Sequence, residues 1–313
     1  MSSKVKTAGS LILLCVVVLA VWFAQPNKPL LWTVANVNTD VLSGDAHLLR
    51  LPNGDNWLID AGYRDFAYGR LLPGIHHHNV TRLKGVIITH AHRNHYGGLY
   101  ALVESDIEID SVFFNAPNRE QCDRERAGGR CLIEHVNATF EMLADNNIPV
   151  RPISEDSVFF DHINLKLSLK TLYQFPARSA PFGNGTINDT SPVMKLIYGN
   201  TSALFAGDLG AAPGGYLADV GENLDADFFV VPHHGVRVTT PNRFFDRVNA
   251  KTALVSGPYA TFNGPRGEQV RQYYGSKNIP LRVAGIEGAL TVKFDERGFE
   301  HSSISVSPEF SAN

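Results

Sequence analysis

Short runs of hydrophobic, often β-branched residues alternate with amphipathic segments along most of the chain. Runs of this kind are typical of strands, and a continuous run such as the one ending at Thr89 is typical of a strand covered on both faces. We predict strands at Leu31–Val37, Ala46–Leu51, Asn56–Asp60, Lys84–Thr89, Ser191–Tyr198, Ser202–Ala206, Ala226–Val231 and Thr252–Ser256. We predict helices at Cys131–Asp145, Asn242–Val248 and Gly267–Tyr274. The pattern indicates an α/β fold with sheets inside and helices outside.

The N-terminus has a different pattern. Lys4 and Lys6 precede an unbroken hydrophobic run from Leu11 to Ala24, which is about as long as a signal-peptide core and short for a spanning helix of roughly 20 residues. Residues 1–28 are therefore predicted to be a secretion signal or a membrane anchor, and bulky aromatic residues before Ala24 favour an uncleaved anchor. The leading lysines predict that the remaining chain lies outside the cytoplasm, periplasmic or extracellular, membrane-anchored or secreted.

Composition and charge narrow the function. With 44% hydrophobic and 19% charged residues among 313, the chain is an ordinary globular protein, and we predict one domain over residues 29–313. The net charge of −3 does not favour nucleic acid as a partner, which would need a local basic patch. Candidates for such a patch are Arg178, Arg237, Arg243, Arg266 and Arg271.

Two cysteines bracket a polar, glycine-containing segment, Cys122 before it and Cys131 after it. In an oxidising compartment this pair can close a small disulfide ring. Two free thiols are the alternative, because spacing alone does not establish the geometry that a disulfide needs.

The strand GVIIT runs directly into THAHRNHYGG, which places three histidines within six residues. Alternation along an extended segment points His90 and His92 the same way, and the following turn brings His95 round. Gly97 and Gly98 permit a tight entry into the next helix. This is a metal-ligand spacing, and we predict that His90, His92 and His95 surround a cation.

Two more predicted strands end in residues that bind metals. Asp208 follows the strand of LFAGDLG, and His233 and His234 follow the strand of FFVVPHHG. A turn is the alternative role for an isolated Asp after Gly. Together with the histidine cluster, however, the three strand ends supply three sets of ligands for one site.

At these residues the chain resembles the metallo-β-lactamase-fold hydrolases, over about Trp32 to Val306. The family's HxHxDH motif, the Asp that bridges two metals and the Asp at the end of a preceding strand have their counterparts here. The resemblance implies an αββα sandwich with a metal site along one edge of its two sheets, preceded here by the N-terminal hydrophobic helix. The matching positions are Asp60, His90, His92, His95, Asp208 and one of His233 and His234.

Within this family, GDAHLLRLPNGDNWLIDAG, TINDTSPVMKLIYG, LFAGDL and VPHHG are similar to the hydrolase domain of the ComEC DNA-uptake channel and its relatives. Three positions depart from the family pattern. Asn94 replaces the Asp of the motif. Either its side-chain oxygen binds a second metal, more weakly than a carboxylate would, or the protein works with one metal. Asp189, in NDTS, either completes a metal shell or is a turn residue. Arg266 replaces a His of the ComEC-like subgroup and becomes a candidate phosphate contact.

The resemblance implies a hydrolase that uses Zn²⁺, as one or two ions, with Mn²⁺ or Fe²⁺ as alternatives. Water activated by the metal would attack a phosphodiester, with His95, Asp208, His234 and Asn94 as the catalytic set. A proton could come from the non-coordinating member of the His233 and His234 pair. Alternatives are a lactamase- or lactonase-type hydrolase of small molecules, and a non-catalytic binding protein on this scaffold. Membrane contact would occur through the N-terminal helix.

The remaining histidines are assigned simpler roles. His76, His77 and His78 are predicted to lie in an exposed loop. His47 is predicted to alternate outward on its strand, although it lies just after Gly44 and Asp45 and could approach the site. The segments Phe175–Thr186 and Cys122–Cys131 are the predicted walls of the substrate site, because loops on a rigid scaffold commonly carry specificity.

Overall fold

The computed structural model describes residues 28–310 except 40, 126–130, 177–179 and 184. The predicted N-terminal segment, residues 1–28, thus lies outside the described residues except for Lys28. Within the described part, no helix has both the length and the hydrophobicity needed to span a membrane.

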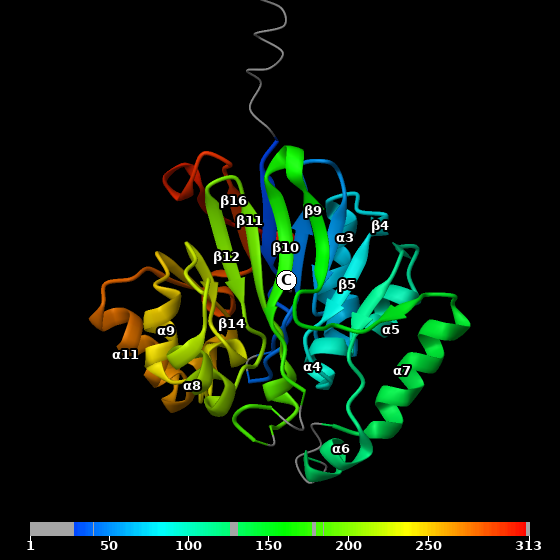
Figure 1. The fold of residues 1–313 in the computed structure, drawn as a ribbon. Coiled ribbons are helices and arrows are strands. Elements are labelled where there is room, and N and C mark those ends of the chain that lie inside the picture. Colours follow the sequence, from blue (N-terminus) through cyan, green and yellow to red (C-terminus); the bar gives the residue numbers. More distant parts are fainter. Residues whose placement is uncertain (1–27, 40, 126–130, 177–179, 184, 311–313) are drawn as a thin grey trace, which may run out of the picture.

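Two large mixed sheets face each other at the centre of the molecule (Figure 1). The first runs in the order β17 (Ser303–Val306), β16 (Leu290–Phe294), β1 (Leu30–Val34), β2 (His47–Arg50), β3 (Asn56–Ile59), β5 (Gly85–Ile88), β7 (Val112–Phe114) and β8 (Val150–Arg151). Its neighbours are antiparallel from β17 to β3 and parallel from β3 to β8.

The second sheet runs in the order β15 (Leu281–Val283), β14 (Thr252–Pro258), β13 (Phe228–Val230), β12 (Thr201–Phe205), β11 (Val193–Tyr198), β10 (Leu167–Tyr173) and β9 (Val158–His162). Here the pairing is parallel from β15 to β12 and antiparallel from β12 to β9. A separate parallel pair joins β4 (Arg82–Leu83) to β6 (Glu108–Ile109).

Helices cover the outer face of each sheet, with α5 and α7 outside the first and α8, α9 and α11 outside the second (Figure 1). The helices that precede β9 are α2 (Arg64–Phe66), α3 (Leu72–His77), α4 (Arg93–Tyr96), α5 (Leu99–Val103), α6 (Arg119–Glu125) and α7 (Ile133–Asp145). Those that follow β12 are α8 (Ala211–Val220), α9 (Asn242–Val248), α10 (Tyr259–Asn263), α11 (Glu268–Ser276) and α12 (Ala284–Glu287). Single turns include η1 (Ala67–Leu71), η3 (Ile163–Leu165), η4 (Asn188–Thr190), η5 (His233–Gly235), η6 (Pro265–Gly267), η7 (Phe299–His301) and η8 (Pro308–Phe310).

Three hydrophobic cores separate four layers. The central core lies between the sheets and contains Trp32 and Phe228. A second core packs the first sheet on its helices and contains Leu102, and a third packs the second sheet on its helices and contains Phe244. This is the predicted order of helix, sheet, sheet and helix, and it follows from strands that are hydrophobic on both faces.

Each predicted strand and helix overlaps an observed one, with ends that differ by a few residues. The predicted hairpin is confirmed, because β11 and β12 pair antiparallel around Gly199, whose φ of 59° suits glycine. Several strands were not predicted, among them β7, β15 and β10. The first two have three residues each, too few to show a period, and they are strands because a neighbour supplies hydrogen bonds. Strand β10 has seven residues with alternating burial, so a period was present in the sequence and was overlooked.

Two local predictions are corrected. His76 and His77 are exposed as expected, but they end helix α3 rather than lying in a loop, and His78 forms an ion pair of 2.7 Å with Glu309. His47 does not point outward: it is 2% exposed and its Nδ1 accepts a hydrogen bond of 3.3 Å from the indole of Trp32 in the central core. Its outward direction was wrong because both faces of β2 are covered.

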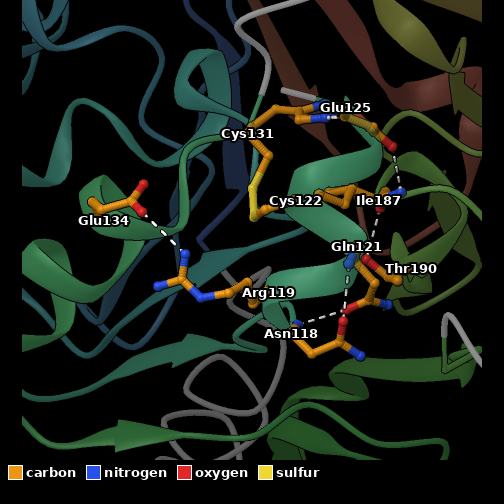
Figure 2. Close-up of a disulfide and its surroundings, with 10 residues drawn as sticks. Asn118, Arg119, Gln121, Cys122, Glu125, Cys131, Glu134, Ile187 and Thr190 are labelled. Carbon is orange, nitrogen blue, oxygen red and sulfur yellow. Dashed lines mark hydrogen bonds and ion pairs between the residues drawn. A yellow bond between two sulfur atoms is a disulfide. The ribbon is translucent and has the colours of Figure 1, made fainter. Parts of the chain in front are cut away.

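Cys122 and Cys131 form a disulfide that joins α6 to the start of α7 (Figure 2). Their Cα atoms are 4.9 Å apart, within the ordinary range for such a bond, and both side chains are buried in the core of the first sheet. Of the two alternatives that the sequence left open, the structure has the disulfide.

Candidate metal centre

Strand β5 delivers the first group of polar side chains. The chain leaves β5 at Ile88, bends at His90 and Ala91, and then forms α4, which contains His95. The turn depends on a close backbone approach at Gly98, where a Cβ atom would lie 2.0 Å from the carbonyl oxygen of Ala61. All three histidines are buried.

Strands β12 and β13 deliver the second group. Asp208 follows β12 after Gly207, and the backbone N–H of His233 donates to the carbonyl of Gly207 at 3.0 Å. His233 and His234 follow β13 with φ values of 54° and 59°. Such left-handed geometry is costly for residues other than glycine and is found mainly at functional sites.

Four imidazoles surround the carboxylate of Asp208. Its Oδ1 lies 3.4 Å from Nε2 of His95 and 3.7 Å from Nε2 of His234. Its Oδ2 lies 3.7 Å from Nε2 of His90 and 3.6 Å from Nε2 of His233. The carboxylate thus presents one oxygen to each of two groups of histidines, as a ligand shared by two cation positions would.

These distances suit a divalent cation better than direct hydrogen bonds. Ligand atoms about 2.0–2.1 Å from a tetrahedral Zn²⁺ lie about 3.3 Å from one another. Nε2 of His95 and Oδ1 of Asp208 are buried and make no hydrogen bond among the described residues. A buried polar atom without a partner is expensive, and a cation between the two atoms would satisfy both. The side chains present therefore fit a metal ion.

The opposite nitrogen of each ring is held by an outer partner, which fixes the direction of the ring. The Nδ1 atom of His95 lies 2.8 Å from Asp60, that of His234 lies 3.2 Å from Ser256, and that of His233 lies 3.2 Å from the carbonyl of Arg237. In His90 the outer atom is again Nδ1, which lies 3.1 Å from Thr89 and 3.3 Å from Ser191. Each arrangement leaves Nε2 turned toward Asp208.

His92 is oriented the other way round. Its Nδ1 lies 3.0 Å from Nε2 of His90, and its Nε2 lies 2.7 Å from the carboxylate of Glu125. Outer hydrogen bonds of this kind orient ligand histidines and make them more basic. Two triads of ligand atoms result, His90, His92 and Asp208 in one and His95, Asp208 and His234 in the other.

Asn94 and Asp189 occupy different positions relative to these triads. The amide of Asn94 lies 2.9 Å from Nε2 of His234, so it is part of the second triad's surroundings. Asp189 instead accepts hydrogen bonds from the backbone and side chain of Thr186, at 2.7 and 2.9 Å. It belongs to no ligand cluster among the described residues and has the geometry of the turn residue that the sequence left as one alternative.

Sequence analysis missed several residues of the site, among them Asp45, Glu125 and Arg93. The carboxylate of Asp45 lies 2.9 Å from Nε2 of His47 and 3.9 Å from Nδ1 of His234. The Asp45 and His47 spacing places both on one side of an extended chain and could have been noticed. Glu125 gave no signal, because only the fold brings α6 to His92.

Neighbouring charges determine which of these groups are ionised without metal. Burial raises the pKa of Asp208, but His234, His95 and His233 outweigh it and hold that pKa well below its usual range. Burial lowers the pKa of His95, but Asp208 and Asp60 outweigh it and raise that pKa well above 6.5. For His90 and His234, burial is decisive and lowers the pKa.

A cavity of about 240 Å³ opens onto the cluster. Arg93, Arg237 and Arg266 lie in its wall together with the site residues. The remaining wall comes from Val41–Ser43, Tyr63, Val236 and Thr261. Among the described residues, the predicted walls at Phe175–Thr186 and Cys122–Cys131 do not contribute, because the chain before β2 covers this side of the site instead.

Replacing Asn94 by Asp is expected to tighten binding of a second metal ion. A carboxylate beside His234 is a stronger ligand than a neutral amide, and the replacement has nearly the same shape. Titration of the metal-free protein with Zn²⁺ should show a second equivalent bound at least about tenfold more tightly. Unchanged stoichiometry and affinity would contradict the placement of Asn94 at the second site.

No family model matches the chain. It is 25% identical over 260 residues to the uncharacterized protein YcaI of Escherichia coli K12, which covers 80% of this chain but only 29% of YcaI. Among solved structures it is similar to CmlA, a diiron β-hydroxylase from Streptomyces venezuelae, with a TM-score of 0.52, 11% identity and coverage of 86% of this chain and 55% of CmlA. The E377D mutant of CmlA matches with the same TM-score. Two facing mixed sheets with a His and Asp cluster where their strands end give this chain the metallo-β-lactamase fold.

Proposed function

We propose that the protein is a metal-dependent hydrolase of the ComEC-like kind that cleaves phosphodiesters. The chain covers only 29% of YcaI, so the proposal rests on the site of this chain itself. Support comes from the paired ligand triads around Asp208 and from the arginines beside them.

A divalent cation, Zn²⁺ or alternatively Mn²⁺ or Fe²⁺, would be held by His90, His92, His95, Asp208 and His234, with His233 and Asn94 at the edge. When bound, it would polarise the substrate and lower the pKa of water. The ligand set of imidazoles and one carboxylate is the set that such ions prefer.

The observation that carries the phosphodiester assignment is the charge of the cavity wall. Three arginines, Arg93, Arg237 and Arg266, line a cavity that opens onto the metal cluster. Arginine is suited to phosphate because its planar group donates two parallel hydrogen bonds to it. The carbonyl that a lactam or lactone hydrolase attacks is uncharged, so that reaction does not by itself require such a wall.

His233 is the best placed proton carrier. It is half-buried at the cavity wall, 21% exposed in its side chain, whereas His234 is 2% exposed. Its Nδ1 faces the carbonyl of Arg237, so Nε2 is turned toward Asp208 and the substrate space. His233 would therefore hold and deliver the proton that the leaving group needs, while His234 serves as a ligand.

Other members of the predicted basic patch are occupied elsewhere. Arg243 forms an ion pair with Asp219, and Arg271 donates to the carbonyls of Phe262 and Gly264. Arg178 lies outside the described residues. Neither Arg243 nor Arg271 lines the cavity. We therefore favour a small phosphodiester or one end of a nucleic acid as the substrate over a long strand bound along an electrostatic track.

Replacing Arg266 by Ala is expected to lower kcat/KM for bis(p-nitrophenyl) phosphate by about 10- to 100-fold. A hydrogen bond to a charged group contributes about 1.5–3 kcal/mol. Metal content should be unchanged, because Arg266 belongs to no ligand cluster. Arg243→Ala is the matched control, since it removes an exposed guanidinium and should leave the kinetics as they are.

Two alternative functions have distinct signatures in the same assays. Turnover of a lactam or lactone with none of bis(p-nitrophenyl) phosphate or single-stranded DNA would establish the lactamase- or lactonase-type hydrolase. Less than one equivalent of transition metal, with normal folding of the His90→Ala, His92→Ala variant, would establish a binding protein. Either result would end the phosphodiesterase proposal.

We also propose that the domain works outside the cytoplasm, held to the membrane through residues 1–28 or released from it. The Cys122–Cys131 disulfide supports this location, because such bonds persist in oxidising compartments. The leading lysines at positions 4 and 6 support the orientation.

A further inference from the structure

Glu125 lies between the metal cluster and the disulfide. It is the last residue of α6, one helical turn after Cys122, and its side chain is 16% exposed. Residues three apart on a helix lie on the same face. Figure 2 shows its carboxylate reaching from α6 toward the chain at Ile187.

Both carboxylate oxygens of Glu125 are engaged. Oε2 lies 2.7 Å from Nε2 of His92, and Oε1 accepts a hydrogen bond of 2.9 Å from the backbone N–H of Ile187. Ile187 is itself buried in the core of the first sheet, so the second contact is anchored. The carboxylate therefore accepts hydrogen bonds from both His92 and Ile187. It holds the ring of His92 with Nδ1 turned toward His90.

The disulfide determines where α6 can place this carboxylate. Cys122 is buried and bonded to Cys131, which immediately precedes α7. A further contact between the two helices is the ion pair of Arg119 with Glu134, whose side chains are 61% and 54% exposed. Exposed pairs of this kind contribute little, so the covalent bond is the stronger of these two links between α6 and α7.

We infer that Glu125 is a positioning residue for the metal ligand His92, and that the Cys122–Cys131 disulfide keeps it in place. The inference rests on the proposed metal-dependent function. It assigns the disulfide a role in metal affinity beyond its contribution to stability. The redox state of a cysteine pair about one helical turn from Glu125 thus becomes coupled to the cluster through a single carboxylate.

The test measures Zn²⁺ affinity by competition with a chromophoric chelator, so it requires no substrate. Glu125→Gln keeps the shape but offers only one acceptor oxygen to two donors, and it should weaken Zn²⁺ binding by about 10- to 100-fold, as is usual for outer partners of ligand histidines. Glu134→Ala removes an exposed carboxylate from α7 and should leave the affinity unchanged. In the cobalt-substituted protein, Glu125→Gln should change the visible spectrum relative to the wild type, whereas Glu134→Ala should leave it unchanged.

The role of the disulfide is tested by a double-mutant cycle. Cys122→Ala with Cys131→Ala should weaken Zn²⁺ binding in the wild-type background but add little further weakening in the Glu125→Gln background. Equal weakening in both backgrounds would overturn the coupling through Glu125. If the cysteine variant fails to fold, wild-type affinity in Glu125→Gln would by itself overturn the inference. Absence of Zn²⁺ binding to the wild-type protein would instead refute the proposed function.

Discussion

Replacing Asp208 by Asn is expected to abolish both hydrolysis and stable metal binding. Asp208 presents an oxygen to each of two groups of histidines, and no other described carboxylate lies at the centre of the cluster. Loss of an outer partner of a ligand typically costs about 10- to 100-fold, so loss of this central ligand should lower kcat/KM by more than about 100-fold. Elemental analysis and steady-state kinetics measure the two effects.

Asp189→Asn is the matched control for this replacement. Asp189 is buried nearby, but its carboxylate caps the turn at Thr186 instead of facing the histidines. The Asp189→Asn replacement should therefore lower the free energy of unfolding more than it lowers the metal content. Full metal occupancy and wild-type turnover in Asp208→Asn would show that the cluster is not the catalytic centre, and the reverse ranking of the two variants would move the centre toward Asp189.

Removing metal is expected to lower the melting temperature by about 8–16 °C. An ion that binds the folded chain at 1,000 times its dissociation constant contributes about 4 kcal/mol, and each kcal/mol moves the midpoint of a domain of this size by about 2–4 °C. The cause here is the buried pair Nε2 of His95 and Oδ1 of Asp208, which lie 3.4 Å apart without a hydrogen bond and which a bound cation would satisfy. Thermal melts with chelator and with added Zn²⁺ measure the shift, which should vanish in Asp208→Asn.

The affinity for the metal should also depend on pH, and it should fall as the pH falls. In the metal-free protein the raised pKa of His95 keeps that ring protonated near pH 7, whereas the lowered pKa values of His90 and His234 keep theirs neutral. Metal needs a neutral His95, so binding releases about one proton, and affinity falls about tenfold for each pH unit below the pKa of His95. Calorimetry in buffers of different ionisation enthalpy counts the proton. Release of none at pH 7 would contradict the charge state of His95.

Local sequence patterns predicted the elements that hold the ligands. The run GVIIT predicted β5, and the spacing after it predicted that His90, His92 and His95 would lie together at the end of that strand. All three are buried there, although the segment bends at His90 and Ala91 instead of running extended. The hairpin before Asp208 was equally clear, because Gly199 marks its turn. Strands such as β7 escaped prediction because three residues carry no period and pairing with β5 and β8 makes them strands.

The sequence by itself determined that metal-binding residue types follow β5, β12 and β13, because the short hydrophobic runs that predict these strands end just before them. Only the tertiary structure decided that Glu125 supports His92, that Asn94 lies beside His234, and that Arg237 and Arg266 share one cavity. These residues are far apart in the sequence, up to 140 positions for Asn94 and His234. Packing of two sheets against each other sets such distances, and no local pattern along the chain encodes them.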